Sequence, residues 1–515
     1  MGKPLYGNPI RKGSTRFFGW LPAYVFAIGC FAAVVVLFAV ATGHYVLGLS
    51  TLVVTLVVVL VFFIPLPTED LTIAQQVVRR VRHATRRRAG ETLFLNSHFS
   101  DRAPGELMGL PGYLHSINTV PMRDGTGKPV ELLHHTQVDM GSVTLVCSPH
   151  GADMQPDKNV TGQIHAFGEW LGSFSREGSL RGASVTVDSV FESSRPLAES
   201  VLEKIDHVRA PEVSQQMVYE AAAALPARVA SMTTYVTLGW RLSSIDADRE
   251  GAYAEIISRL PKHRAALAAA GAGQVRAMTD ADYGDMMYTA YNPHRNVEVA
   301  HELQEGVPAF RTFDGSGPEY MNADHKRVVL HDGVASMTAI MTVPDPSKIT
   351  ERSYQELFAP SHHFLRKRVT LFYRPIVATD QRKRIDAASR ATTSENTSRK
   401  RYTAYEAKRQ QQVGQAMSQM ASGAKLHEWG LMVTVTFEPN EKAQRAAENE
   451  LKALMGGMRW VFADFAADAA FHQTLPIGVF PWVYGDKLAT LLSKKTNVLS
   501  REEGEKRKEG KGESA

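Results

Sequence analysis

The chain has 515 residues, with 58 lysines and arginines against 53 aspartates and glutamates, and a formal net charge of +5. A charge this small, concentrated near the N-terminal segment, argues against a dedicated nucleic-acid-binding protein. Only two cysteines are present, Cys30 and Cys147, so one chain cannot build a disulfide framework or a cysteine metal site. The residues after the N-terminal segment suffice for two or three domains of ordinary size.

The N-terminal segment contains two long apolar runs. Between Arg16 and Glu69 there is no Asp, Glu, Lys or Arg, and residues 17–41 and 45–64 are each long enough to cross a bilayer as a helix. Basic residues precede the first run and follow the second, which places both ends inside. We therefore expect a transmembrane hairpin over residues 1–67 in the cytoplasmic (inner) membrane, with the N-terminus and the C-terminal domains in the cytoplasm.

Residues 68–90 predict a basic amphipathic helix. Apolar residues repeat at helical spacing and arginines cover the opposite face. The functional interpretation is contact with the membrane surface and anionic lipid, and the simpler one is ordinary positive-inside topology. The arginines proposed for this contact are Arg79, Arg80, Arg82, Arg86, Arg87 and Arg88.

The rest of the chain alternates short β-branched runs with amphipathic helices, a pattern typical of α+β folds. We expect strands at 142–149, 183–191, 233–240, 368–376 and 430–437, and helices at 160–175, 247–270 and 441–455. Asn440 is placed to cap the last helix. These units predict ferredoxin-like, split β-α-β layers in two cytoplasmic α+β domains, at 91–300 and 301–493, followed by a disordered tail at 494–515.

Residues 378–421 form a polar tract almost free of glycine and proline, which predicts a long helix or a helical hairpin. Its basic residues could contact a partner or DNA, but a solvated helical face is the interpretation we favour. The candidate contact residues are Arg382, Lys383, Arg384, Arg399, Lys400 and Arg401.

Catalytic motifs are missing from the sequence. There is no P-loop, because Lys128 of the one internal Gly-Lys pair is followed by Pro129, and there is no GxGxxG, GxSxG or HExxH. The adjacent pairs His134-His135 and His362-His363 make poor chelates, since neighbouring side chains of a strand point to opposite faces. We therefore expect no catalytic residue, no metal, no cofactor and no enzymatic activity.

The arrangement resembles a known family. The segments SVTLVCSPHG (142–151), RKRVTLFYRPI (366–376), LMVTVTFEPN (431–440) and QTLPIG (473–478), behind a PrgI-like two-span hairpin, resemble actinobacterial conjugation-type membrane proteins. In such proteins the region after the hairpin is similar to the N-terminal, non-ATPase part of the TrbE/TraC/CagE class. The resemblance is one of layout and segment character.

The resemblance implies a membrane-anchored scaffold of a type IV secretion-like machine that docks a separate P-loop ATPase. Its expected partners are the bilayer, that ATPase and other membrane proteins of the machine, with DNA met indirectly, and the assembly is expected to be oligomeric. The alternatives are an EccE-like component of a type VII secretion machine, a membrane-tethered enzyme, and a DNA-handling module that uses the basic tract.

Overall fold

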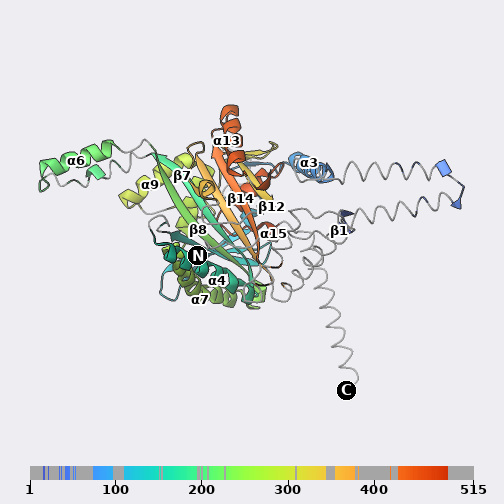
Figure 1. Cartoon of the computed structure of the whole chain (residues 1–515), viewed down its shortest axis with the longest axis horizontal. Coiled ribbons are helices and arrows are strands. Elements are labelled where there is room, and N and C mark those ends of the chain that lie inside the picture. The colour runs from blue at the N-terminus through green and yellow to red at the C-terminus, as the bar shows by residue number, and fades with distance from the viewer. Residues whose placement is uncertain are drawn as a thin grey trace, which may run out of the picture.

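The computed structural model describes most of the chain between residues 73 and 484 (Figure 1). The described residues are 73–96, 109–149, 155–193, 208–224, 228–307, 310–343, 354–376, 427–456 and 458–484, with 16, 17, 21, 22, 34, 36, 41–43, 45, 46, 50, 53, 151, 198, 201–203, 205, 381, 414 and 418.

Thirteen strands form one antiparallel sheet, in the order β3-β10-β11-β12-β14-β13-β7-β8-β6-β5-β4, with β15 added beside β12 and β9 beside β6. Their bounds are β3 (Leu93–Leu95), β4 (Ile117–Arg123), β5 (Pro129–His135), β6 (Met140–Ser148), β7 (Leu180–Ser193), β8 (Arg228–Arg241), β9 (Gln274–Ala277), β10 (Tyr320–Asn322), β11 (Val328–His331), β12 (Val334–Val343), β13 (Arg366–Pro375), β14 (His427–Phe437) and β15 (Arg459–Phe462).

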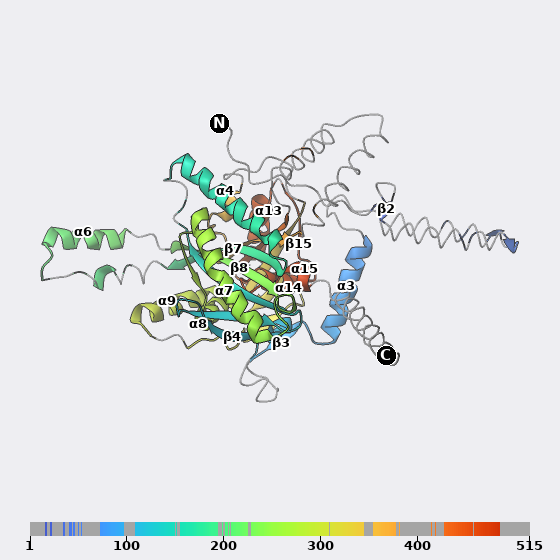
Figure 2. The same ribbon diagram turned by 90° about the horizontal axis from the view of Figure 1, so that it is seen from below.

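Helices cover both faces of this sheet (Figures 1 and 2). The helices are α3 (Ile73–Arg88), α4 (Asp157–Ser173), α7 (Arg249–Leu267), α8 (Asp280–Tyr291), α9 (Asn296–Glu305), α10 (Gln355–Phe358), α13 (Glu441–Leu454), α14 (Ala467–Gln473) and α15 (Pro481–Tyr484). A further helix, α6 (Glu212–Ala223), stands away from the sheet in both views and buries no residue. Single turns are η1 (Gly112–Ser116), η2 (Phe174–Arg176), η3 (Leu242–Ser244), η4 (Ala268–Ala272) and η5 (Pro293–Arg295).

The sheet contains the same unit twice. In the first half the chain runs β6-α4-β7-β8-α7-β9, and these strands lie in the order β9-β6-β8-β7. In the second half it runs β12-α10-β13-β14-α13-β15, with the order β15-β12-β14-β13. Both are the 4-1-3-2 order of a split β-α-β unit. In both halves the first strand also pairs with the strand before it, β5 with β6 and β11 with β12.

A pseudo-two-fold axis relates the halves and passes between β7 and β13, which pair with each other. Thr186 lies opposite Thr370 in this pairing, with Ser184 opposite Phe372 on one side and Asp188 opposite Arg368 on the other. The neighbouring strands give the same correspondence, because Ser184 pairs with Thr237 just as Arg368 pairs with Thr434. Each unit therefore contributes its free edge strand to the other, which removes two exposed edges.

Period-two alternation separates the faces of the sheet. On one face, aliphatic residues of β6 and β8 pack under α4 and α7, and those of β12 and β14 pack under α13. On the other face these four strands, together with β7 and β13, carry buried hydroxyls, and a third core formed with α8 and α14 extends over both halves. The buried hydroxyl residues are Ser142, Thr144, Ser184, Thr186, Thr237, Ser336, Thr338, Thr370, Thr434 and Thr436.

The QTLPIG segment lies across this hydroxyl face. Thr370 donates to the carbonyl of Thr474 at 3.1 Å, Thr144 donates to the carbonyl of Pro476 at 2.7 Å, and Ser142 donates to the carbonyl of Ile477 at 3.3 Å. These carbonyls are buried, so the strand hydroxyls replace the water that they lose. The segment thus ties the first half to the second.

The predicted fold class is wrong. We expected a two-helix transmembrane hairpin followed by separate ferredoxin-like layers, whereas the strands of both halves join in one sheet of 13 strands. At the start of the expected first span, Arg16–Phe17 (β1) pairs antiparallel with Leu21–Pro22 (β2), which is incompatible with a helix that begins there.

The predicted two-span membrane localisation is corrected as well. Among the residues that the structure describes, no helix combines the length and the apolar character that a membrane crossing needs. Most of residues 17–64, where both spans were predicted, lie outside the described residues.

Candidate functional site

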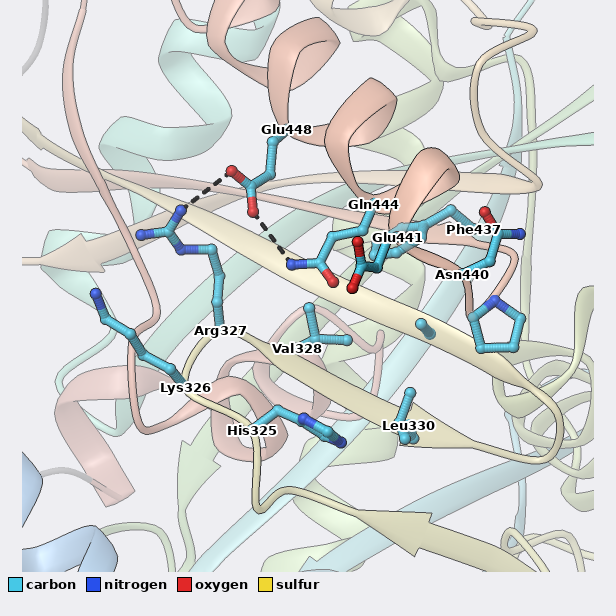
Figure 3. A pocket seen from close by; sticks show the side chains of 12 residues that line it. His325, Lys326, Arg327, Val328, Leu330, Phe437, Asn440, Glu441, Gln444 and Glu448 are labelled. Atoms are coloured by element: carbon cyan, nitrogen blue, oxygen red, sulfur yellow. Dashed lines mark hydrogen bonds and ion pairs between the residues drawn. The ribbon is translucent and has the colours of Figure 1, made fainter.

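A pocket of about 490 Å³ opens in the second half, between α13 and β11 (Figure 3). Its volume is within the usual range for ligand pockets. The residues that line it are His325, Lys326, Arg327, Val328, Leu330, Ala335, Phe437, Pro439, Asn440, Glu441, Gln444 and Glu448.

The floor of the pocket is apolar. Val328 and Leu330 alternate along β11, and Ala335 follows on β12, so all three side chains face the side of the sheet that α13 covers. Phe437, the last residue of β14, closes one end of the floor. This floor can accept an aliphatic or aromatic side chain.

The wall is polar and comes from α13. Asn440 caps this helix, as predicted, by accepting from the backbone amide of Ala443 at 2.8 Å. Figure 3 shows that Glu448 lies between Gln444 and Arg327 and contacts both. The Nε2 of Gln444 donates to Oε1 of Glu448 at 3.3 Å. Arg327 Nη1 donates to the other oxygen, Oε2, at 3.2 Å.

Arg327 is held from three sides. Its Nε donates to Asp464 Oδ1 at 3.0 Å, and its guanidinium carbon lies 4.0 Å from the centre of the Phe462 ring. Burial works against its charge, but the hydrogen bond to Asp464 and the field of Glu448 outweigh burial and raise the pKa of Arg327. The arginine is a fixed, permanently charged part of the wall.

In the first half, apolar side chains fill the space that corresponds to the α13 pocket. Both helices begin at a capping residue: Asp248 accepts from the residue three positions later, as Asn440 does. Aligned by their buried positions, Ala252 and Ile256 of α7 correspond to Ala443 and Ala447 of α13, so Gln444 and Glu448 correspond to Tyr253 and Ile257. Tyr253 and Ile257 are buried in the core of the first half. The two polar wall residues therefore stand where the first half has apolar core residues.

The connection before the helix also differs between the halves. Residues 242–248 join β8 to α7, whereas residues 438–440 join β14 to α13. The longer connection places Leu242 over Gly141, where an added Cβ would lie 3.0 Å from the Leu242 side chain. Gly141 corresponds to Ala335, since both follow the turn into the first strand of their unit. In the second half the space above Ala335 is open as part of the pocket.

These comparisons indicate what the pocket can bind. The first half seals the same place with an aliphatic side chain, Leu242, carried on a short backbone segment. A polypeptide segment with one aliphatic side chain would meet the apolar floor, while its backbone would meet the amide of Gln444 and the carboxylate of Glu448. We interpret the pocket as a peptide-docking site.

The predicted membrane-surface arginines are on α3, which packs beside the second half. Arg86 forms an ion pair with Asp468 at 2.6 Å, and Arg87 lies 3.5 Å from Asp324. Arg80 lies over the Phe465 ring at 5.9 Å. Arg82 and Arg88 are exposed and Arg79 is half-buried. Three of the six arginines thus contact the protein itself, and lipid contact of the helix stays a prediction.

The second predicted set lies outside the described residues. It comprises Arg382, Lys383, Arg384, Arg399, Lys400 and Arg401. Contact of this set with DNA or a partner therefore stays a prediction.

Two buried Ser–His pairs were not anticipated, and they are related by the pseudo-two-fold axis. His135 Nε2 lies 2.8 Å from Ser142 Oγ, and His331 Nε2 lies 2.8 Å from Ser336 Oγ. Burial lowers the pKa of both histidines to about 3, so both are neutral at physiological pH. Neither pair lines the pocket, and both are fully buried, so they act as internal hydrogen bonds rather than as nucleophile and base.

The sequence itself carries a signal of the duplication. Ser142 and Thr144 recur as Ser336 and Thr338, each pair shortly after a histidine that ends the preceding strand. This repeated pattern would have aligned the two halves and pointed to the polar replacements on α13.

No protein-family model matches the chain, and no curated protein matches it.

Proposed function

We propose that this chain is a scaffold component of a type IV secretion-like machine and that it docks a separate P-loop ATPase. The observation that carries the proposal is the α13 pocket, which has an apolar floor and a polar wall where the first half has a sealed core. In this proposal the ATPase inserts an aliphatic side chain of a short segment over Val328 and Leu330. The family resemblance of the sequence supplies the class of partner.

The wall chemistry supports a protein partner. Glu448 and Arg327 neutralise each other, so the pocket offers no net charge for a highly charged small molecule. The amide of Gln444 keeps an acceptor oxygen and a second N–H for a peptide backbone. An apolar anchor surrounded by polar groups is the usual anatomy of a protein–protein hot spot.

The experiment measures binding of the purified chain to the P-loop ATPase encoded in the same gene cluster. Leu330→Trp fills the pocket from its floor and should weaken binding at least tenfold, because the indole takes the place of the ATPase anchor. Lys442→Trp introduces the same residue on an exposed position of α13 outside the lining and should leave the affinity unchanged. Both variants are compared with the native chain by thermal unfolding.

Equal affinity for the native chain and Leu330→Trp would remove the pocket from the docking role. Failure of the ATPase to bind the native chain at all would reject the partner. Robust ATP hydrolysis by the purified chain alone would contradict the scaffold role itself.

A further inference from the structure

Arg368 is a charged side chain enclosed at the centre of the sheet. It lies on β13, two residue pairs from the pseudo-two-fold axis, and is 1% exposed. Its Nε, Nη1 and Nη2 have no hydrogen-bond partner among the residues that the structure describes. By contrast, its neighbour Arg366 donates to both oxygens of Asp188 at 2.6 to 3.0 Å.

Within the part of the chain that the structure describes, one positive charge near Arg368 is uncompensated. Asp188 pairs with Arg366, so the two arginines and one carboxylate carry a net charge of about +1. Burial lowers the pKa of Arg368 to about 10, which still leaves the guanidinium charged at neutral pH. Guanidinium groups do not lose their charge in proteins under such conditions.

The other titratable groups around Arg368 are neutral at pH 7. Burial raises the pKa of Tyr235 to about 12 and raises that of Tyr291 further. Burial lowers the pKa of His331 to about 3 and that of His472 to about 4. Beyond His472, the carboxylate of Asp468 is already paired with Arg86 at 2.6 Å. None of these groups supplies the missing negative charge.

The fold does not require arginines at this place. By the pseudo-two-fold axis, Arg366 and Arg368 correspond to Gly182 and Ser184. There the space is filled by Trp482, whose ring would lie 2.5 Å from a Cβ added to Gly182. The same sheet is thus built on one side of the axis with an apolar filling and on the other with two cations.

One face of the Arg368 guanidinium stacks on an aromatic ring, while its N–H groups have no hydrogen-bond partner among the described residues. The carbon of the group lies 4.6 Å from the centre of the Phe471 ring on α14. This stacking covers the π-face, while the N–H donors lie in the plane of the group and point past the ring. A buried charge with unused donors destabilises the folded state unless a counter-charge accepts from them.

We propose that a small inorganic anion of the size of chloride binds at the edge of the Arg368 guanidinium, enclosed between β13 and α14. The anion accepts from the unused N–H groups and cancels the excess charge beside Asp188 and Arg366. It is a structural ligand of the folded chain, and its release accompanies unfolding.

The test compares the thermal stability of the full chain in sodium chloride and in sodium gluconate, at equal ionic strength. Gluconate is too large to enter a closed site, so the melting temperature should rise with chloride and not with gluconate. Arg368→Gln should abolish the difference between the two salts. Lys367→Met is the matched control, because Lys367 is an equally buried cation on the opposite face that donates to the carbonyl of Ala359. It should keep the chloride dependence.

Crystals grown in sodium bromide give a second readout that does not depend on a variant folding. An anomalous bromide peak beside the Arg368 guanidinium would support the proposal. Equal melting temperatures in chloride and gluconate, or density for water alone at this place, would overturn it.

Discussion

Thr186 and Thr370 share a hydrogen bond of 3.1 Å between their Oγ1 atoms at the point where the pseudo-two-fold axis passes through the sheet. The proton directions follow from the next contact. Thr370 gives its only hydroxyl proton to the carbonyl of Thr474, so Thr186 must donate to Thr370. The centre of the molecule is therefore a directed chain of hydrogen bonds from the first half, through the second, to the C-terminal segment.

This series of hydrogen bonds predicts that Thr370→Val is less stable than the native protein. The substitution keeps the shape of the side chain but leaves the buried carbonyl of Thr474 and the hydroxyl of Thr186 without their partner. We expect the free energy of unfolding to fall by about 1 to 3 kcal/mol, measured by urea titration. Thr342→Val is the control, because Thr342 is exposed and its loss should cost under about 0.5 kcal/mol. Equal losses of stability in the two variants would contradict this series of hydrogen bonds.

Buried histidines predict acid sensitivity. His135, His331 and His472 have folded pKa values of about 3, 3 and 4, against an ordinary 6.5 when exposed. Below pH 6.5 the unfolded chain binds protons that the folded chain cannot, so stability is full above this pH and falls as the pH drops toward 4. Each histidine contributes a slope of about 1.4 kcal/mol per pH unit. Urea titrations at pH 7, 6 and 5 measure the summed slope, and a flat profile would contradict neutral buried histidines.

Glu131 is expected to lower the stability of the folded chain at high pH, opposite to the histidines, which lower it at low pH. Burial, with Asp280 and Asp314 nearby, raises its pKa from 4.5 to about 7. The unfolded chain loses this proton first, so the contribution of Glu131 to stability is full below pH 4.5 and is lost as the pH rises to 7. Glu131→Gln should therefore be more stable than the native chain by about 1 to 3 kcal/mol at pH 8.

The same comparison at pH 4 checks the cause. There Glu131 is protonated in both states, so the gain from Glu131→Gln should disappear. Glu169→Gln, on the exposed side of α4, should have no effect at either pH. A gain of equal size at pH 4 and pH 8 would show that the charge of Glu131 is not responsible.

Local structure was predictable from the sequence because its signals are local. The predicted strand at 430–437 is confirmed by β14, and the predicted helix at 441–455 by α13 with its Asn440 cap. Period-two alternation and a capping residue are enough for such elements. The joining of both halves in one sheet was not predictable in this way, because the pairing of Thr186 with Thr370 joins residues that are far apart in the sequence.

The candidate site was missed for a related reason. Gln444 and Glu448 look like ordinary exposed residues of an amphipathic helix, and only comparison with Tyr253 and Ile257 marks them as polar replacements of core positions. Arg368 likewise looks like part of a basic run in RKRVTLFYRPI, because the strand alternation that buries it is hidden by its charged neighbours. The apolar segment at 17–64 was overinterpreted, since hydropathy records composition and not the structure that the segment adopts.

The contacts of α3 predict unequal effects of its arginines. Arg86→Ala removes the arginine that pairs with the half-buried carboxylate of Asp468, so we expect a loss of about 1 to 3 kcal/mol in the free energy of unfolding. Arg82→Ala removes an exposed charge of the same helix and should change stability by less than about 0.5 kcal/mol. Urea titration of both variants measures the difference. Equal stability would mean that α3 is not held to the second half through Arg86.

Substitutions on α13 that close the pocket should weaken docking without unfolding the protein. In Gln444→Ala/Glu448→Ile, both polar residues of the pocket wall are replaced by apolar residues. The isoleucine covers the floor at Val328 and Ala335, and Arg327 keeps its pairing with Asp464. The double variant should therefore fold with stability within about 1 kcal/mol of the native chain, because apolar burial offsets the lost ion pair. It should bind the ATPase at least tenfold more weakly, measured by calorimetry. A stable double variant with unchanged affinity would place docking elsewhere on the molecule.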